Sequence, residues 1–266
     1  MFQETLTYQA DGLTMRSQLF FEATSHPCAG VLVFPEAFGL GSHVIERAKR
    51  LCEQGYVALA CDLHGEARHV DDLPEAMSLL QPLFDDPSRT RARAAAALQA
   101  LIARHEVDAV RIAAIGFCFP MPLELARSGA NLRAVVGFHT SLATKKPTTD
   151  ARTIKAKVLV CIGADDPYIP PDQRATSEAE MRDAGVDWQM HVYGRTVHSF
   201  TNKEVAKRNM PDVLRYSLEA DTRSWASLLE LFSETLANET KRSSELETSG
   251  NGFLPFAVPV VTTPNA

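Results

Sequence analysis

The stretch RIAAIGFCFPMPLELARSG, residues 111–129, changes its character within a few residues. The run RIAAIGF is short and apolar, which is typical of a strand buried on both faces of a sheet. The residues LELARSG that close the stretch are interpreted as part of a helix. Cys118, Pro120 and Pro122 lie between the two. A strand that turns directly into a helix is the repeating unit of α/β folds.

The same alternation continues on both sides of this stretch. Short apolar runs that suit buried strands occupy residues 31–34, 56–63, 111–117, 132–139, 157–163 and 188–194. Segments with helical spacing occupy residues 43–55, 85–105, 172–185 and 221–240. Strands that alternate with helices predict an α/β fold with a mostly parallel, doubly wound sheet.

The two ends of the chain differ from this pattern. Residues 2–22 alternate loosely around Asp11-Gly12, a strong signal for an antiparallel hairpin at the start of the fold. A chain of 266 residues is long enough for one large core, so we expect a single α/β domain over residues 1–240. Residues 241–266 mix Ser, Gly and Pro with a short apolar patch, and we expect a disordered C-terminal tail there.

Composition excludes several classes of partner. The formal net charge is −6, so the chain lacks the basic footprint of a nucleic-acid binder. No apolar run approaches the roughly 20 residues of a membrane span, and the first residues do not form a signal peptide. We therefore expect a cytoplasmic protein with no membrane partner. The five cysteines are widely spaced and form no C-x-x-C pair, which argues against a disulfide framework and against a zinc site.

Cys118 occupies a position where chemistry is expected. Ligands of open α/β sheets bind at the carboxyl ends of the strands, and Cys118 directly follows one. Gly116-Phe117-Cys118 has the spacing of a nucleophile elbow, a sharp turn between strand and helix. A helix N-terminus favours the thiolate, and its N–H groups can hold an oxyanion. The alternative is structural, because a free cysteine is more often a small buried hydrophobe.

An acid and a base follow Cys118 along the chain. Asp165 and Asp166 come after the predicted strand 157–163, and His198 comes after the predicted strand 188–194. The order nucleophile, acid, histidine is that of the α/β-hydrolases. Either aspartate suits the role of acid, since Asp-Asp-Pro is also good turn chemistry. His64 and His139 also follow strands and are second choices for the base.

Four motifs appear in order at predicted strand ends: PEAFG (35–39), GFC (116–118), GADDPYIP (163–170) and VHSF (197–200). With them, residues 1–235 resemble the dienelactone hydrolase family, α/β-hydrolases with a Cys-His-Asp triad. The resemblance implies Cys118 as nucleophile, His198 as base and Asp166, rather than Asp165, as the orienting acid. It also implies Glu36 beside the thiol, an oxyanion hole formed by the N–H groups of Ala37 and Phe119, and no metal or organic cofactor.

The glutamate beside the thiol has a physical rationale. A carboxylate disfavours a neighbouring thiolate through like-charge repulsion. A thiolate that forms only when Glu36 is drawn away would resist oxidation between turnovers.

The sequence departs from the family pattern at two places. Pro120 stands where the elbow usually has glycine, and it pushes Phe119 away from the helical region, which alters the aim of the Phe119 N–H. Asn202 stands where the best-known members have an arginine for the carboxylate of the lactone. Arg68 and Arg195 are candidates to replace that contact. The sequence therefore does not predict dienelactone itself as the natural substrate.

These observations predict a cysteine-dependent hydrolase of carboxylic esters or lactones that works through an acyl-enzyme. Its partner is a small-molecule substrate, and the protein is a monomer or a small homo-oligomer. Pro120 motivates an alternative, a catalytically weak or inactive relative that binds a small ligand without turnover. A redox-sensing thiol at Cys118 is a third hypothesis.

Overall fold

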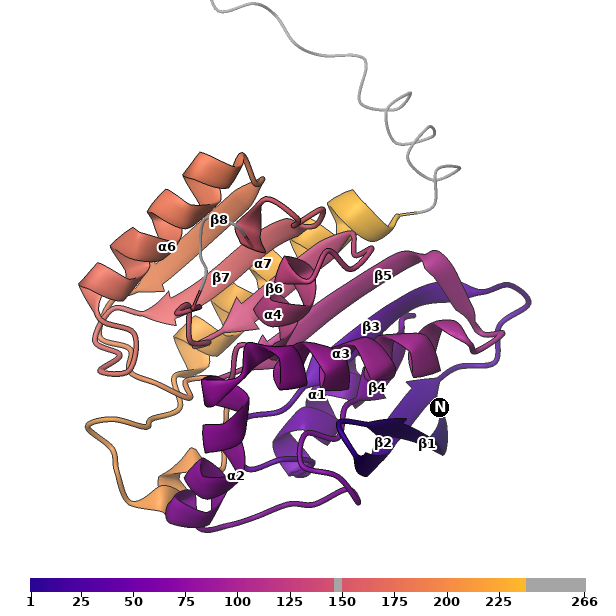
Figure 1. The fold of residues 1–266 in the computed structure, drawn as a ribbon, viewed down its shortest axis with the longest axis horizontal. Coiled ribbons are helices and arrows are strands. Elements are labelled where there is room, and N and C mark those ends of the chain that lie inside the picture. The colour runs from indigo at the N-terminus through magenta and orange to yellow at the C-terminus, as the bar shows by residue number, and fades with distance from the viewer. Residues whose placement is uncertain (146–149, 238–266) are drawn as a thin grey trace, which may run out of the picture. The chain divides into compact units, whose positions relative to one another are not determined.

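The apolar runs of the sequence form one sheet of eight strands in this computed structural model, which describes residues 1–145 and 150–237 (Figure 1). The strands are β1 (Phe2–Ala10), β2 (Leu13–Phe21), β3 (Cys28–Phe34), β4 (Val57–Ala60), β5 (Val107–Phe117), β6 (Ala134–Phe138), β7 (Lys157–Gly163) and β8 (Trp188–Tyr193). Their order is β1-β2-β4-β3-β5-β6-β7-β8. Strands β1 and β2 form an antiparallel hairpin, and β2 pairs antiparallel with β4. Strands β3 to β8 all run parallel to one another. The predicted sheet and its N-terminal hairpin are confirmed.

Helices cover both faces of this sheet. They are α1 (Ser42–Cys52), α2 (Leu73–Asp85), α3 (Pro87–Ile102), α4 (Met121–Arg127), α6 (Pro171–Ala184) and α7 (Leu218–Leu236), with a 3-10 turn η1 (Val205–Arg208). Figure 1 shows α3, α4 and α6 in front of the sheet and α1 and α7 behind it. Two apolar cores result, one beneath α2, α3 and α4 and one beneath α1 and α7. Strands β4 and β6 are buried along their whole length, as a sheet covered on both faces requires.

Helix α2 was not predicted from the sequence. We expected a helix from residue 85 onward, but Asp86 separates two helices, because its side chain accepts the Ser88 N–H and caps α3. Pro82 lies inside α2, where a proline removes a helical hydrogen bond and hides the helical pattern. The omission matters because α2 lies over the candidate site.

A buried charge network attaches α4 to α6. Arg127 on α4 has no exposed side-chain surface, and it donates to both carboxylate oxygens of Glu180 on α6 at 2.8 and 2.9 Å. It also donates to Glu124 at 3.0 Å and to the carbonyl of Leu142. A buried guanidinium requires such complete pairing. The network fixes the helix that follows Cys118.

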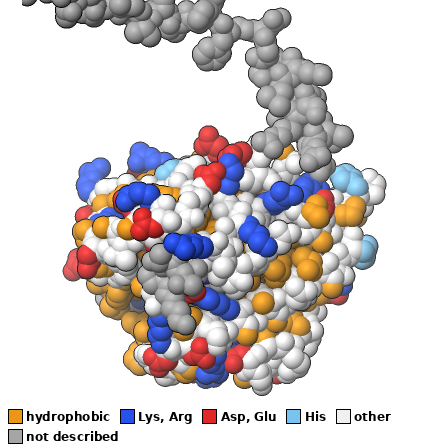
Figure 2. Space-filling model, turned by 45° about the horizontal axis from the view of Figure 1, so that its top comes forward, with side chains coloured by type: hydrophobic (Ala, Val, Ile, Leu, Met, Phe, Trp, Pro, Cys, Tyr) orange, Lys and Arg blue, Asp and Glu red, His pale blue; other side chains and the backbone are white. Residues whose placement is uncertain are grey.

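Residues Met1 to Leu236 form one compact unit, and the predicted tail 241–266 lies outside the described residues. No helix in the described part of the chain is long and apolar enough to cross a membrane. On the face shown in Figure 2, acidic and basic side chains are interspersed rather than separated by sign. This face therefore offers no extended basic surface, in keeping with the net charge of −6.

Candidate active site

The candidate residues gather at the carboxyl edge of the parallel strands. Glu36 and Ala37 follow β3, Cys118 follows β5, Asp166 follows β7 and His198 follows β8. Strands β3 and β5 are neighbours, with Phe34 opposite Gly116, so their two loops leave the sheet side by side. The chain order reverses at β3, which has β4 on one side and β5 on the other. Open α/β sheets bind ligands at such a point.

Cys118 sits on a sharp turn with left-handed backbone, at a φ of 62°. This region is strained for a residue with a side chain, and it recurs at functional sites. The Cys118 N–H donates to Phe138 on β6, and the Phe119 N–H donates to the carbonyl of Phe117 at 2.6 Å. The thiol is partly exposed. A side chain added at Gly116 would come within 2.8 Å of the Pro122 ring, so the glycine makes room for the proline.

The two prolines leave the helix intact, as expected. Pro120 occupies the N-cap of α4 with a φ of −78°, and Pro122 lies in the first turn. Neither position needs an N–H for an intrahelical bond. Phe119 lies between Cys118 and Pro120, and its N–H is engaged with the carbonyl of Phe117 across Cys118.

The second predicted oxyanion residue, Ala37, is arranged differently. Its N–H donates to no backbone carbonyl in the described part of the chain. Its carbonyl accepts from His64 Nε2 at 2.8 Å, so His64 carries its proton on Nε2. Burial lowers the pKa of His64 and keeps the imidazole neutral. His64, a second choice for the base, therefore holds the loop of Ala37.

His198 and Asp166 form a buried hydrogen-bonded pair. The distance from Nδ1 to Oδ2 is 2.7 Å, and the two residues are both 3% exposed. Asp166 Oδ1 accepts the Tyr168 N–H, whereas Asp165 is exposed. His198 Nε2 is buried and has no hydrogen-bond partner among the described residues. Burial opposes the charged form of His198, but the neighbouring Cys118 and Asp166 outweigh it and raise the pKa to about 10.

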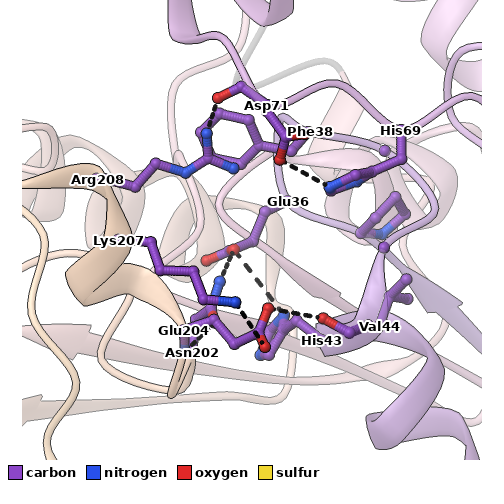
Figure 3. Close-up of a pocket in the computed structure, with 14 residues that line it drawn as sticks. Glu36, Phe38, His43, Val44, His69, Asp71, Asn202, Glu204, Lys207 and Arg208 are labelled. Atoms are coloured by element: carbon purple, nitrogen blue, oxygen red, sulfur yellow. Dashed lines mark hydrogen bonds and ion pairs between the residues drawn. The ribbon is translucent and has the colours of Figure 1, made fainter.

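Glu36 belongs to a buried polar cluster, and no Lys or Arg of the described residues pairs with it. Its Oε2 accepts from Asn202 Nδ2 at 2.6 Å and lies 4.0 Å from His43 Nδ1 (Figure 3). Its Oε1 lies 4.0 Å from His139 Nε2 and accepts no hydrogen bond from the described residues. Thr201 Oγ1 joins the two imidazoles, at 2.9 Å from His139 and 3.2 Å from His43. His139, the other second choice for the base, is thus bound to Thr201.

The contact between Asn202 and Glu36 was not foreseen. The sequence indicated only that Asn202 replaces an arginine, four residues after His198. Burial lowers the pKa of both His43 and His139, so neither imidazole supplies a positive charge at neutral pH. Glu36 is accordingly held by neutral groups.

A pocket of about 350 Å³ opens in front of the thiol. Cys118 and His198 both line it, together with Glu36 and the two residues predicted to form the oxyanion hole, Ala37 and Phe119. Its outer wall comes largely from α2 and consists of Leu73, Met77, Leu80 and Phe84. The wall is therefore apolar, while the polar groups gather at the strand ends.

The two arginines considered for a substrate carboxylate lie elsewhere. Arg68 pairs with Glu75 at 2.5 Å, and Arg195 lines a separate hollow near the start of α7. Neither lines the pocket of Cys118. Among the described residues, no group of three or more His, Cys, Asp or Glu side chains is arranged to hold a metal ion.

Comparison with known proteins identifies the family. The model of the dienelactone hydrolase family matches residues 16–236. The chain belongs to the dienelactone hydrolase family. It is 26% identical over 226 residues to a protein of Yersinia pestis named "Putative carboxymethylenebutenolidase", covering 78% of this chain and 79% of that one.

Solved structures agree with this assignment. A dienelactone hydrolase-like promiscuous phosphotriesterase from metagenomic libraries superposes with a TM-score of 0.85 at 41% identity, over 89% of this chain and 99% of that one. A "Putative Dienelactone Hydrolase" from Klebsiella pneumoniae subsp. pneumoniae gives a TM-score of 0.73 at 25% identity, over 87% and 98%. As a dienelactone hydrolase-like protein, the chain is a hydrolase that acts on ester bonds.

Proposed function

We propose that the chain hydrolyses carboxylic esters or lactones through a covalent acyl-enzyme on Cys118. The observation that carries the proposal is the 2.7 Å contact between His198 and Asp166, with Cys118 lining the same pocket. A nucleophile, a base within reach and an acid that orients the base are the requirements of acyl transfer. The raised pKa of His198 favours the imidazolium, the form that results when the base takes the thiol proton.

The reaction then takes two steps. The Cys118 thiol gives its proton to His198, and the sulfur attacks the carbonyl carbon to form a tetrahedral oxyanion. The C–O bond to the leaving group breaks as His198 returns the proton to the departing oxygen. Water, deprotonated by His198, attacks the thioester and releases the acid, and the sulfur recovers the proton from His198. No electrons are gained or lost.

The oxyanion hole is the weak part of this site. The Ala37 N–H is free of backbone partners in the described residues, but the Phe119 N–H must leave the carbonyl of Phe117 before it can bind the oxyanion. Loss of one such donor costs on the order of a hundredfold in rate. We therefore propose a modest turnover rate. Replacement of Pro120 by a residue with a less restricted backbone should increase the turnover rate.

Glu36 is proposed to control the thiolate. Its carboxylate lines the pocket beside Cys118 and is held by the neutral amide of Asn202. Like charges repel, so the carboxylate restrains ionisation of the thiol until a substrate occupies the pocket.

Hydrolysis of short p-nitrophenyl esters tests the proposal. The chain should release nitrophenol with a burst, and mass spectrometry of quenched samples should find the acyl group on Cys118. Cys118→Ala should abolish both signals, whereas Cys28→Ala should change neither, because Cys28 is a partly exposed thiol at the opposite end of β3. Equal turnover by Cys118→Ala and the unaltered chain would refute a cysteine nucleophile.

The second candidate is a ligand-binding relative without turnover, which the engaged Phe119 N–H favours. Pro120→Gly separates it from the enzyme. Thiol-dependent turnover that rises in this variant supports the enzyme, while its absence from both proteins supports a binding protein. Because one relative is described as a promiscuous phosphotriesterase, neutral phosphotriesters belong in the same substrate panel.

A further inference from the structure

Two hollows share a wall at the strand ends. The first is the pocket of Cys118, and the second, of about 240 Å³, lies beside η1 and the N-terminal end of α1 (Figure 3). Glu36 and Phe38 line both of them. The loop after β3 therefore forms a partition, with the thiol on one side.

The two hollows differ in charge. Among the described residues, no Lys or Arg lines the pocket of Cys118. Its one lining carboxylate is Glu36, which belongs to the wall that the two hollows share. The second hollow is lined by two cations, Lys207 and Arg208, together with the carboxylates of Glu36, Asp71 and Glu204. Lys207 pairs with Glu204 at 3.1 Å, and Arg208 donates to the carbonyl of Asp71. A cation that could bind a substrate carboxylate is thus present, but on the wrong side of the partition.

The aromatic ring of Phe38 is the part of the wall that meets Arg208. The guanidinium carbon of Arg208 lies 3.5 Å from the centre of the Phe38 ring, in a cation–π contact visible in Figure 3. Phe38 also lines the pocket of Cys118, which Arg208 does not line. The ring therefore shields the substrate pocket from the cation behind it.

This arrangement disfavours an anionic substrate. A carboxylate that enters the pocket gives up water, meets the apolar wall of α2 and gains no cation. The buried Glu36 carboxylate adds like-charge repulsion. A neutral apolar ester pays neither penalty and buries its chain against the same wall.

We propose that Phe38 is a specificity-determining residue whose ring separates the Cys118 pocket from Arg208, so that the enzyme selects neutral apolar esters over esters that carry a carboxylate. This inference rests on the proposed esterase function. It differs from that function in its prediction, because it concerns the ratio of two activities rather than the presence of one.

The test compares p-nitrophenyl valerate with mono-p-nitrophenyl glutarate, in which a carboxylate replaces the terminal methyl group. The unaltered chain should favour valerate by at least about 100-fold in kcat/KM, after correction for uncatalysed hydrolysis. Phe38→Ala should lower that preference by about 10-fold or more, since the glutarate carboxylate can then reach Arg208. The double variant Phe38→Ala with Arg208→Gln should restore the preference.

Met77 provides a matched control, and it is also a position at which a cation can be added to the pocket without altering Phe38. It lines the Cys118 pocket from α2 and does not line the second hollow. Met77→Ala should change both activities together and leave the ratio unaltered, whereas Met77→Lys should lower the preference by placing a cation at the rim. The milder Phe38→Leu serves if Phe38→Ala does not fold, as judged by circular dichroism.

The outcomes distinguish the two proposals. Equal kcat/KM for the two esters in the unaltered chain would overturn the inference and leave the esterase function standing. An unchanged preference in Phe38→Ala or Phe38→Leu would show that Phe38 is not the determinant. Hydrolysis of neither ester would refute the esterase function and the inference with it.

Discussion

Replacement of Asp166 by asparagine tests the electrostatic core of the site. Protonated His198 is stabilised by its neighbours enough to raise its pKa from 6.5 to about 10, against the penalty of burial. At about 1.4 kcal/mol for each tenfold change, this corresponds to roughly 5 kcal/mol. Cys118 and Asp166 are the two neighbours responsible, and the charge of Cys118 is the largest favourable contribution. Removing one partner of a buried, hydrogen-bonded charge pair costs about 2–5 kcal/mol. Asp166→Asn should therefore lower kcat/KM for p-nitrophenyl esters by about 100-fold.

Asp165→Asn is the matched control. Asp165 adjoins Asp166 in the chain but is exposed and has no hydrogen bond to His198. It should retain the activity of the unaltered chain. Equal losses in the two variants would refute the reasoning, and so would full activity in Asp166→Asn.

The same pair predicts how stability depends on pH. The pKa of His198 is higher in the folded chain than its ordinary 6.5, so the folded state binds this proton more tightly than the unfolded state. The resulting stabilisation is complete below pH 6.5 and is lost as the pH rises toward about 10. Urea unfolding across this range should show a smaller loss in Asp166→Asn than in the unaltered chain. An identical loss would contradict the assignment of the pKa shift to Asp166.

Two further predictions concern the backbone and the buried charges. Cys118→Gly should be more stable than Cys118→Ala by about 1 kcal/mol in urea unfolding, because a φ of 62° strains alanine but not glycine; the opposite order would argue against strain at the elbow. Arg127→Met should lower the free energy of unfolding by about 3–5 kcal/mol, because it leaves the buried carboxylate of Glu180 without its cation, while Glu124 keeps only Arg91. A change below about 1 kcal/mol would mean that this network contributes little.

The predicted strands and most helices followed from local periodicity, and their errors have local causes. The sequence around residue 82 did not indicate α2, because a proline inside a helix masks the pattern. Strand β5 begins at Val107, earlier than the predicted residue 111, because a register shift opposite Ala29 and Gly30 interrupts the strand. Neither error changed the predicted fold class, since the predicted strands and helices alternate along the chain as observed.

The site was only partly accessible to sequence reasoning. Cys118 could be selected because the glycine, cysteine and prolines of its turn are adjacent in the chain. Between Asp165 and Asp166 the residues alone left the choice open, and the resemblance to the family favoured Asp166. In the structure it is Asp166 that contacts His198, 32 residues away.

The sequence by itself determined the α/β class, the parallel sheet and the strand ends where polar residues gather, because these follow from interactions between near neighbours in the chain. Only the tertiary structure decided that Asn202 holds Glu36 across 166 residues, that α2 forms the pocket wall and that Phe38 separates Arg208 from the thiol. These contacts depend on strand order and on the packing of loops from distant segments. Periodicity along the chain does not record which distant side chains meet.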